Sequence, residues 1–274
     1  MAQSLNFLVT VFFDALLYPF RRLPPFWGIL FLSILTALAV LLVYRYVSSP
    51  GKIKKAKNQI KANILAIRLY KDFWKIILAS FFKSLGWTAR YFALNFGPVL
   101  LLSPVLFLLF VQMDVRYGMR PFRPGEEIVL KARLQQRPEA VQPELLASPA
   151  FRPRMKPVFL TALREADWRL SAEREGTSEL RLRIRGNEYG KSLLIGRQQA
   201  ALSNKKLARS SWAHFIYPVE KMLAPAPGVL ESLEIRYPPR YIPVLGLQTH
   251  WLFDYLLLVL VIVLALRKRF GVEF

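Results

Sequence analysis

The residues of this sequence that could do chemistry are isolated polar groups inside or beside long apolar runs. Ser33, Thr36 and Asn95 lie within such runs, while Arg45 and Arg90 lie at run ends. Polar groups at membrane depth usually face the interior of a helix bundle or a water-filled cavity. These residues could therefore line a polar groove. For the two arginines, snorkelling to the lipid headgroups is the alternative.

A group of lysines that follows the first apolar run forms a second candidate set. Its members are Lys52, Lys54, Lys55, Lys57 and Lys61. They could meet anionic lipid headgroups, or they could contact a nascent chain, a ribosome or a partner helix. Nucleic acid is not expected as the main ligand, because the same cations already satisfy the charge rule for membrane topology.

Signatures of catalysis are missing from the sequence. It has no Gly-rich phosphate loop, no HExxH, no GxSxG and no acidic metal cluster. It has no Cys, and its two His residues are His214 and His250, which leaves little room for a zinc site. Asp254 is expected to be an interface or helix-start acid with water nearby. We therefore expect a protein that is not an enzyme and that needs neither cofactor nor metal.

The elements that must position these residues follow from composition. Hydrophobic residues make up 54% of the 274 residues, above the ~45–50% of soluble domains, and they are concentrated in blocks. This distribution excludes an ordinary soluble enzyme. The formal net charge of +21 indicates an anionic partner, and the negative cytoplasmic leaflet is the simplest one.

Three blocks are apolar enough to be transmembrane helices: residues 26–46, 91–113 and the shorter 251–266. A helix needs about 20 apolar residues to cross a bilayer, and the prolines in the second block are tolerated where neighbouring groups satisfy the freed backbone. Residues 1–25 have apolar residues at helical spacing, interrupted by Asp14. They predict an amphipathic helix lying in the membrane interface, with a spanning helix as the alternative.

The distribution of basic residues predicts the orientation of these spans. Residues 51–90 hold ten cations and one acid, Asp72, and three further cations follow the third span. By the positive-inside rule both regions are cytoplasmic. The N-terminus and residues 114–250 are then outside, and the 267–274 tail is inside, in a multi-pass protein of the cell (inner) membrane.

The two long connections have different patterns. Residues 47–90 show helical spacing that breaks near Asp72, which predicts a basic, amphipathic helical hairpin. Residues 114–250 alternate apolar and polar positions in short segments separated by Pro and Gly, which is typical of an all-β, immunoglobulin-like sandwich. The expected strands are residues 126–134, 158–163, 168–172, 180–184, 192–195 and 233–237. Residues 198–211 are expected to be a helical or irregular insertion.

This layout resembles the three-span core of the YidC-type membrane-protein insertases. The resemblance covers roughly residues 26–113 and 251–270, and it includes the segment YRYVSSPGKIKKAKNQIKA after the first span. The layout of the chain is similar to that of the minimal archaeal YidC-like proteins and of the insertase subunit of the endoplasmic-reticulum membrane complex. The chain differs from them in having an extra extracytoplasmic β domain. The resemblance implies a hydrophilic groove open to the cytoplasm that helps nascent membrane proteins insert, with Arg45 and Arg90 nearest the family's groove arginine.

A non-catalytic scaffold is the second function that this sequence allows. In that case the spans anchor a β sandwich that docks an envelope partner, or the chain is an accessory subunit of a transporter. A polar, cytoplasm-facing cavity containing Arg90 and Asn95 would favour the insertase, whereas a bundle packed by lipid alone would favour the scaffold.

Overall fold

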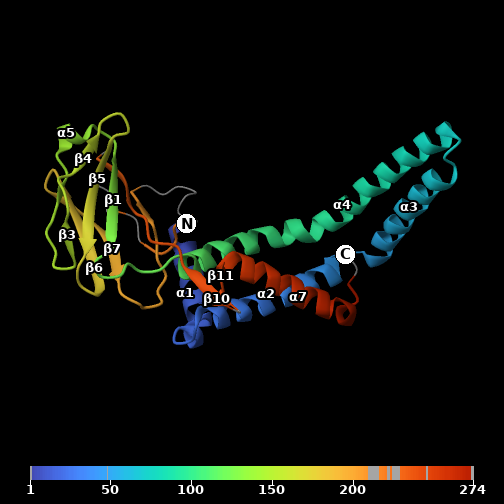
Figure 1. Cartoon of the computed structure of the whole chain (residues 1–274), viewed down its shortest axis with the longest axis horizontal. Coiled ribbons are helices and arrows are strands. Elements are labelled where there is room, and N and C mark those ends of the chain that lie inside the picture. The colour runs from blue at the N-terminus through green and yellow to red at the C-terminus, as the bar shows by residue number, and fades with distance from the viewer. Residues whose placement is uncertain are drawn as a thin grey trace. The chain divides into compact units, whose positions relative to one another are not determined.

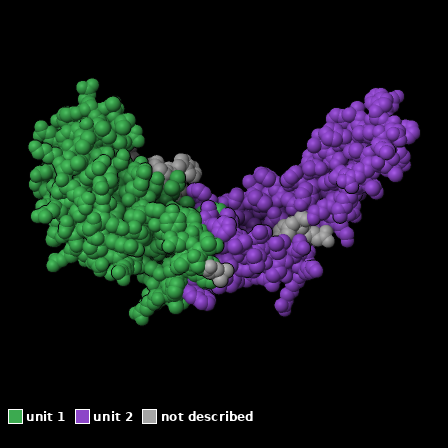
Figure 2. Space-filling model, in the orientation of Figure 1, with its two compact units in different colours: residues 1–26, 108–251 green, residues 27–107, 252–274 purple. Residues whose placement is uncertain are grey.

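The computed structural model describes residues 2–47, 49–208, 216–220, 223, 229–244 and 246–272, with side chains from Asn6 onward. It contains helices and antiparallel β sheets (Figure 1). The chain forms two compact units, coloured separately in Figure 2. The first comprises Met1–Phe26 and Leu108–Trp251, and the second comprises Trp27–Phe107 and Leu252–Phe274.

The helices follow the apolar blocks of the sequence. They are α1 (Ala2–Leu16), the short 3-10 turn η1 (Tyr18–Phe20), α2 (Pro25–Val47), α3 (Pro50–Leu69), α4 (Trp74–Met113) with the π turn η2 (Asp114–Gly118), the single-turn α5 (Pro138–Val141) and α7 (Trp251–Phe270). Among the described residues, α2 and the continuous segment Trp74–Gly118 are long and apolar enough to cross a membrane. Helix α7 has 20 residues, but Asp254 in its first turn and three cations in its last turn make its apolar run shorter than that of α2.

Helix α4 joins two elements that the sequence predicted separately, the second arm of the hairpin and the second span. It runs for 40 residues without a break, which is about 60 Å of helix, roughly twice the hydrocarbon thickness of a bilayer. It also passes through two prolines. Pro104 cannot donate to the carbonyl of Leu100, and the Ser103 hydroxyl donates to that carbonyl instead, at 2.9 Å.

Within the second unit, α2 and α7 pack together and run in the same direction (Figure 1). The Tyr255 hydroxyl, near the start of α7, lies beside Thr36. Beyond it the contact continues as an apolar cluster that includes Leu41 and Tyr44 of α2 and Val263 of α7. Because α2 is apolar on all sides, the sequence pattern does not show which of its faces meets α7.

The basic connection forms two helices, as the spacing around Asp72 predicted. Helix α3 ends at Leu69 and α4 begins at Trp74, so the turn between them is residues 70–73. The two helices run in opposite directions (Figure 1). The Lys57 ammonium of α3 lies 5.7 Å from the centre of the Tyr91 ring of α4, a distance at which a cation interacts with an aromatic face.

The described residues of the β region form three antiparallel sheets. The largest has the order β3-β5-β1-β9-β8, with β4 also paired to β5; the others are β2-β6-β7 and the hairpin β10-β11. The strands are β1 (Glu127–Leu134), β2 (Glu144–Leu145), β3 (Phe151–Pro153), β4 (Val158–Leu160), β5 (Glu165–Ala172), β6 (Gly176–Ile184), β7 (Asn187–Ile195), β8 (Lys205–Leu207), β9 (Leu230–Ile235), β10 (Tyr241–Val244) and β11 (Leu247–His250).

Every predicted strand is present, and the alternation of buried and exposed residues explains why. In β1 and β5, and in β6 from Leu180 onward, every second residue is buried. The buried residues of the two larger sheets share one hydrophobic core. The strands β2, β3, β8, β10 and β11 were not predicted, because they are only two to four residues long. The insertion predicted for residues 198–211 was wrong in part, since it contains β8.

Candidate functional site

The five groove candidates fall in different environments. Ser33 and Thr36 are buried in α2, and the Ser33 hydroxyl has no hydrogen-bond partner among the residues that the structure describes. Arg45 is exposed at the end of α2. Arg90 is exposed on α4 and stacks on Trp87 of the same helix, 5.4 Å from the ring centre. These residues are thus not gathered around one point.

Asn95 is also occupied locally. Its side-chain amide donates to the carbonyl of Tyr91, one turn earlier in α4, at 2.8 Å. A bond of this kind satisfies the amide within its own helix. The polar groups that do meet are Thr36 and Tyr255, at the contact of α2 with α7. Asp254, directly before Tyr255, lies in the first turn of α7, as expected for a helix-start acid, and only 4% of its surface is exposed.

The hairpin presents cations and large apolar side chains together. Lys52, Lys54, Lys55 and Lys61 are exposed, and Lys57 is half-buried. From the second half of α3 to the middle of α4 the exposed apolar residues, which we call the hairpin surface, are Ile64, Leu65, Leu69, Tyr70, Phe73, Trp74, Ile76, Leu78, Phe81, Phe82 and Leu85. An apolar surface of this extent on a folded chain marks an interaction site.

Sequence reasoning missed an ion pair that holds α1 in the first unit. Arg116, in η2 and 8% exposed, donates to the Asp14 carboxylate of α1 at 2.8 Å. The same guanidinium donates to the carbonyls of Gln112 and Thr10 and lies over the ring of Phe13 at 5.9 Å. The sequence offered evidence for this ion pair, because Asp14 is the only acid in α1 and Arg116 is the first cation after the second apolar block.

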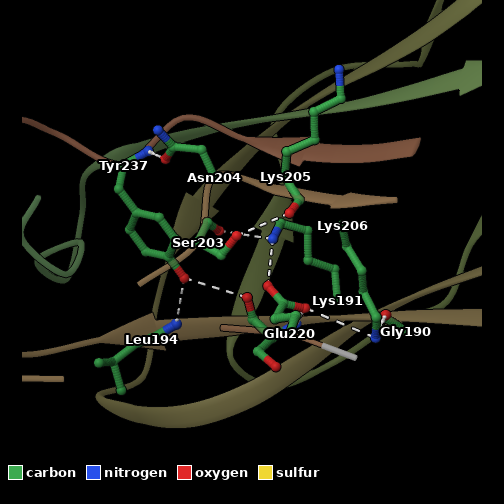
Figure 3. Close-up of polar contacts among 10 residues, drawn as sticks. Gly190, Lys191, Leu194, Ser203, Asn204, Lys205, Lys206, Glu220 and Tyr237 are labelled. Atoms are coloured by element: carbon green, nitrogen blue, oxygen red, sulfur yellow. Dashed lines mark hydrogen bonds and ion pairs between the residues drawn. The ribbon is translucent and has the colours of Figure 1, made fainter. Parts of the chain in front are cut away.

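A second missed cluster is a buried ion pair in the β region (Figure 3). Lys191 of β7 is fully buried, and its ammonium donates to Glu220 at 2.5 Å and to the carbonyl of Ser203 at 2.8 Å. The other oxygen of Glu220 accepts from the Ser192 amide and lies 3.9 Å from the Lys206 ammonium. Both charged groups of the pair thus have hydrogen-bond partners within the fold.

Burial shifts the titration of this cluster. It lowers the pKa of the Lys191 ammonium, and the neighbouring Glu220 carboxylate opposes that shift. Burial also raises the pKa of Tyr237 to about 12. The Tyr237 hydroxyl accepts from the Leu194 amide at 3.1 Å and donates to the Ser192 carbonyl at 3.3 Å. These contacts tie β7 to the segments that follow β8 and β9, which is a structural role.

Metal-binding groups are not clustered in the part of the chain that the structure describes: it contains no group of three His, Cys, Asp or Glu side chains that could hold an ion. His250 ends β11 and lies 5.7 Å from the ring of Trp251. His214 lies outside the described residues.

The chain thus combines two helices that could cross a membrane with an antiparallel β region. No protein-family model matches it, and no curated protein or solved structure is significantly similar to it.

Proposed function

We propose that this chain is an integral membrane protein that assists the insertion or assembly of other membrane proteins, without covalent chemistry, cofactor or metal. The observation that carries the proposal is the hairpin surface, in which large apolar side chains are exposed beside lysines. Such a surface suits an apolar segment of a nascent membrane protein with flanking acidic or polar residues.

The length of α4 argues for a protein client over a lipid surface. If residues 91–113 cross the bilayer, Trp74 lies 17 residues before that span in the same helix (91 − 74 = 17), about 26 Å away along the axis. The part of the hairpin surface around Trp74 then stands off the membrane in water. Lipid cannot cover it there, so a protein segment is the partner that would.

The topology that we propose has α2, α4 and α7 as three spans, and the β region as an extracytoplasmic, immunoglobulin-like sandwich. The N-terminus is outside, and the hairpin and C-terminal tail are cytoplasmic, with the lysines at the start of α3 beside anionic lipid. The parallel packing of α2 and α7 supports this topology, because the first and third of three consecutive spans must cross in the same direction. The YidC-type insertases that the chain resembles have the same arrangement of three core spans.

Cysteine labelling in intact cells tests the topology, since the chain has no Cys of its own. Thr177→Cys on β6 and Lys83→Cys on α4 both replace exposed residues. We expect an impermeant maleimide to label Thr177→Cys fully and to leave Lys83→Cys unlabelled until the cells are permeabilised. Equal labelling of the two variants in intact cells would contradict the proposed orientation.

Photocrosslinking in living cells tests the client-binding role. A benzophenone amino acid at Phe82, which is 61% exposed, should crosslink to newly made single-span proteins, whereas one at Tyr241, which is 56% exposed in the β region, should not.

The triple variant with Leu69→Gln, Phe73→Gln and Phe82→Gln should lower client insertion about tenfold at equal protein abundance. The reason is that a loss of ~1.4 kcal/mol of binding free energy lowers the affinity tenfold. Crosslinks from Phe82 to lipid alone, with normal insertion by the triple variant, would remove the proposal.

The scaffold remains the second candidate, and a specific observation favours it. Arg45 and Arg90 are exposed, Ser33 and Thr36 are buried in α2, and Asn95 is bonded within α4. They are therefore not arranged as the shared lining of one polar groove. A scaffold would still bind an envelope protein through its β region when the hairpin surface is made polar. Pulldown of envelope proteins by the triple variant therefore distinguishes the two functions.

A further inference from the structure

Four arginines converge on one cavity of the first unit, and the backbone explains how two of them reach it. The Arg120 amide donates to the Pro238 carbonyl and the Arg240 amide donates to the Gly118 carbonyl, both at 2.9 Å. Met119 and Pro239 form the antiparallel bridge between these bonds. Side chains alternate along paired strands, so Arg120 and Arg240 project from the same face of this short ladder.

The other two arginines come from the end of β7 and from the segment that pairs with it. The Gly196 amide donates to the Phe122 carbonyl at 2.7 Å, and Arg123 and Arg197 directly follow these two residues. Gly196 has a φ of +136°, which is accessible to glycine and strained for other residues. The chain can therefore turn out of β7 at this point and bring Arg197 to the cavity.

The cavity has a volume of about 250 Å³, room for a group the size of several water molecules. Its lining includes Arg120, Arg123, Arg197, Arg240, Gln199 and Pro25. Among the described residues, the lining includes no carboxylate. Of the four guanidiniums, only that of Arg120 forms an ion pair in the described part of the chain, with Glu126 at 2.8 Å.

Arg197 and Arg240 thus face the cavity without a carboxylate at ion-pair distance among the described residues, whereas Arg120 and Arg123 both interact with Glu126. Arg240 is half-buried, and burial lowers the pKa of its guanidinium, but arginine stays charged in proteins at any ordinary pH. A half-buried cation loses hydration free energy that a paired anion would restore. The planar guanidinium matches two phosphate oxygens at once.

We propose that this cavity is a binding site for a phosphate group, carried by an anionic lipid headgroup or free in solution. Pro25 is the first residue of α2, so the cavity opens where the chain would enter the bilayer, and lipid phosphate is available at that depth. The site is independent of client insertion, because none of its residues belongs to the hairpin.

The test uses the full-length protein in a neutral detergent and two probes, short-chain phosphatidylglycerol and inorganic phosphate. Arg197→Gln with Arg240→Gln should weaken binding of the probe at least about tenfold, since hydrogen bonds to charged groups contribute ~1.5–3 kcal/mol each. The matched control is Arg152→Gln with Arg174→Gln, which removes the same charge from exposed positions of the β region. It should change binding less than about twofold, within the range of a screened surface charge.

The two probes distinguish the sources of the phosphate. If phosphatidylglycerol binds and inorganic phosphate fails to displace it, the site belongs to a lipid headgroup. If inorganic phosphate binds alone and competes with the lipid, the site takes free phosphate. Equal affinity of the wild type and the Arg197/Arg240 variant for both probes, or an equal loss in the Arg152/Arg174 control, would overturn the site. Unchanged client insertion by the Arg197/Arg240 variant is expected in either case.

Discussion

Glu220→Gln is expected to destabilise the β region by about 3–5 kcal/mol, the cost of leaving a buried charge without its partner. The variant keeps the size of the side chain but removes the carboxylate that faces the fully buried Lys191 ammonium at 2.5 Å. Amides of β6 and β7 in the full-length protein should then exchange with deuterium faster by roughly two to four powers of ten, at ~1.4 kcal/mol per tenfold.

Two further variants separate the ion pair from the loss of any surface charge. Glu188→Gln breaks an exposed pair with Arg183 at 2.9 Å in the same sheet, and it should change the exchange rates far less, because exposed ion pairs contribute little to stability. Lys191→Met together with Glu220→Gln removes both charges, and it should restore most of the lost protection. If Glu220→Gln and Glu188→Gln have equal effects on exchange, the buried pair does not hold the β region together.

The burial of Lys191 could have been predicted from the sequence, but its ion-pair partner Glu220 could not. In β7 the side chains of Tyr189, Lys191 and Leu193 lie on one face, and all three are buried, so a strand assigned from residue 187 would have placed a lysine in the core. The predicted strand began only at residue 192. Glu220 lies in a region without periodic pattern, and no local rule brings it to β7.

The same distinction between local and long-range information holds for the helices. Apolar blocks predicted α2 and α4, and the break near Asp72 predicted the hairpin turn, because these features depend on neighbouring residues. The contact of α2 with α7 and the pairing of Asp14 with Arg116 join residues far apart in the chain. The groove candidates were chosen for their polarity alone, which could not show that Asn95 is bonded to its own helix.

The continuity of α4 is the feature of the hairpin that a single residue can test. Gly86 lies in α4 between the hairpin surface and the predicted second span, and a Cβ added there meets no atom within 4 Å. Gly86→Ala should therefore stabilise the helix by about 1 kcal/mol, whereas Gly86→Pro should cost about 3 kcal/mol or more and kink it. The two substitutions act at one position with opposite sign.

Spin labels at Lys75 and Phe92 measure this effect, because both residues are exposed and the chain has no other cysteine to label once they are replaced. They are 17 residues apart in α4 (92 − 75 = 17), which gives about 26 Å in a continuous helix. The wild type and Gly86→Ala should show one narrow distance distribution near this value, and Gly86→Pro should show a broad and shifted one.

The functional consequence follows from the position of the hairpin surface. A rigid α4 holds that surface in water at a fixed distance from the span, and Gly86→Pro releases it to lie on lipid while leaving every exposed apolar side chain in place. Client crosslinking from Phe82 should then fall in Gly86→Pro and stay normal in Gly86→Ala at equal abundance. A broad distance distribution in the wild type, or full crosslinking by Gly86→Pro, would show that the span does not position the hairpin, and the argument for a protein client over lipid would fail.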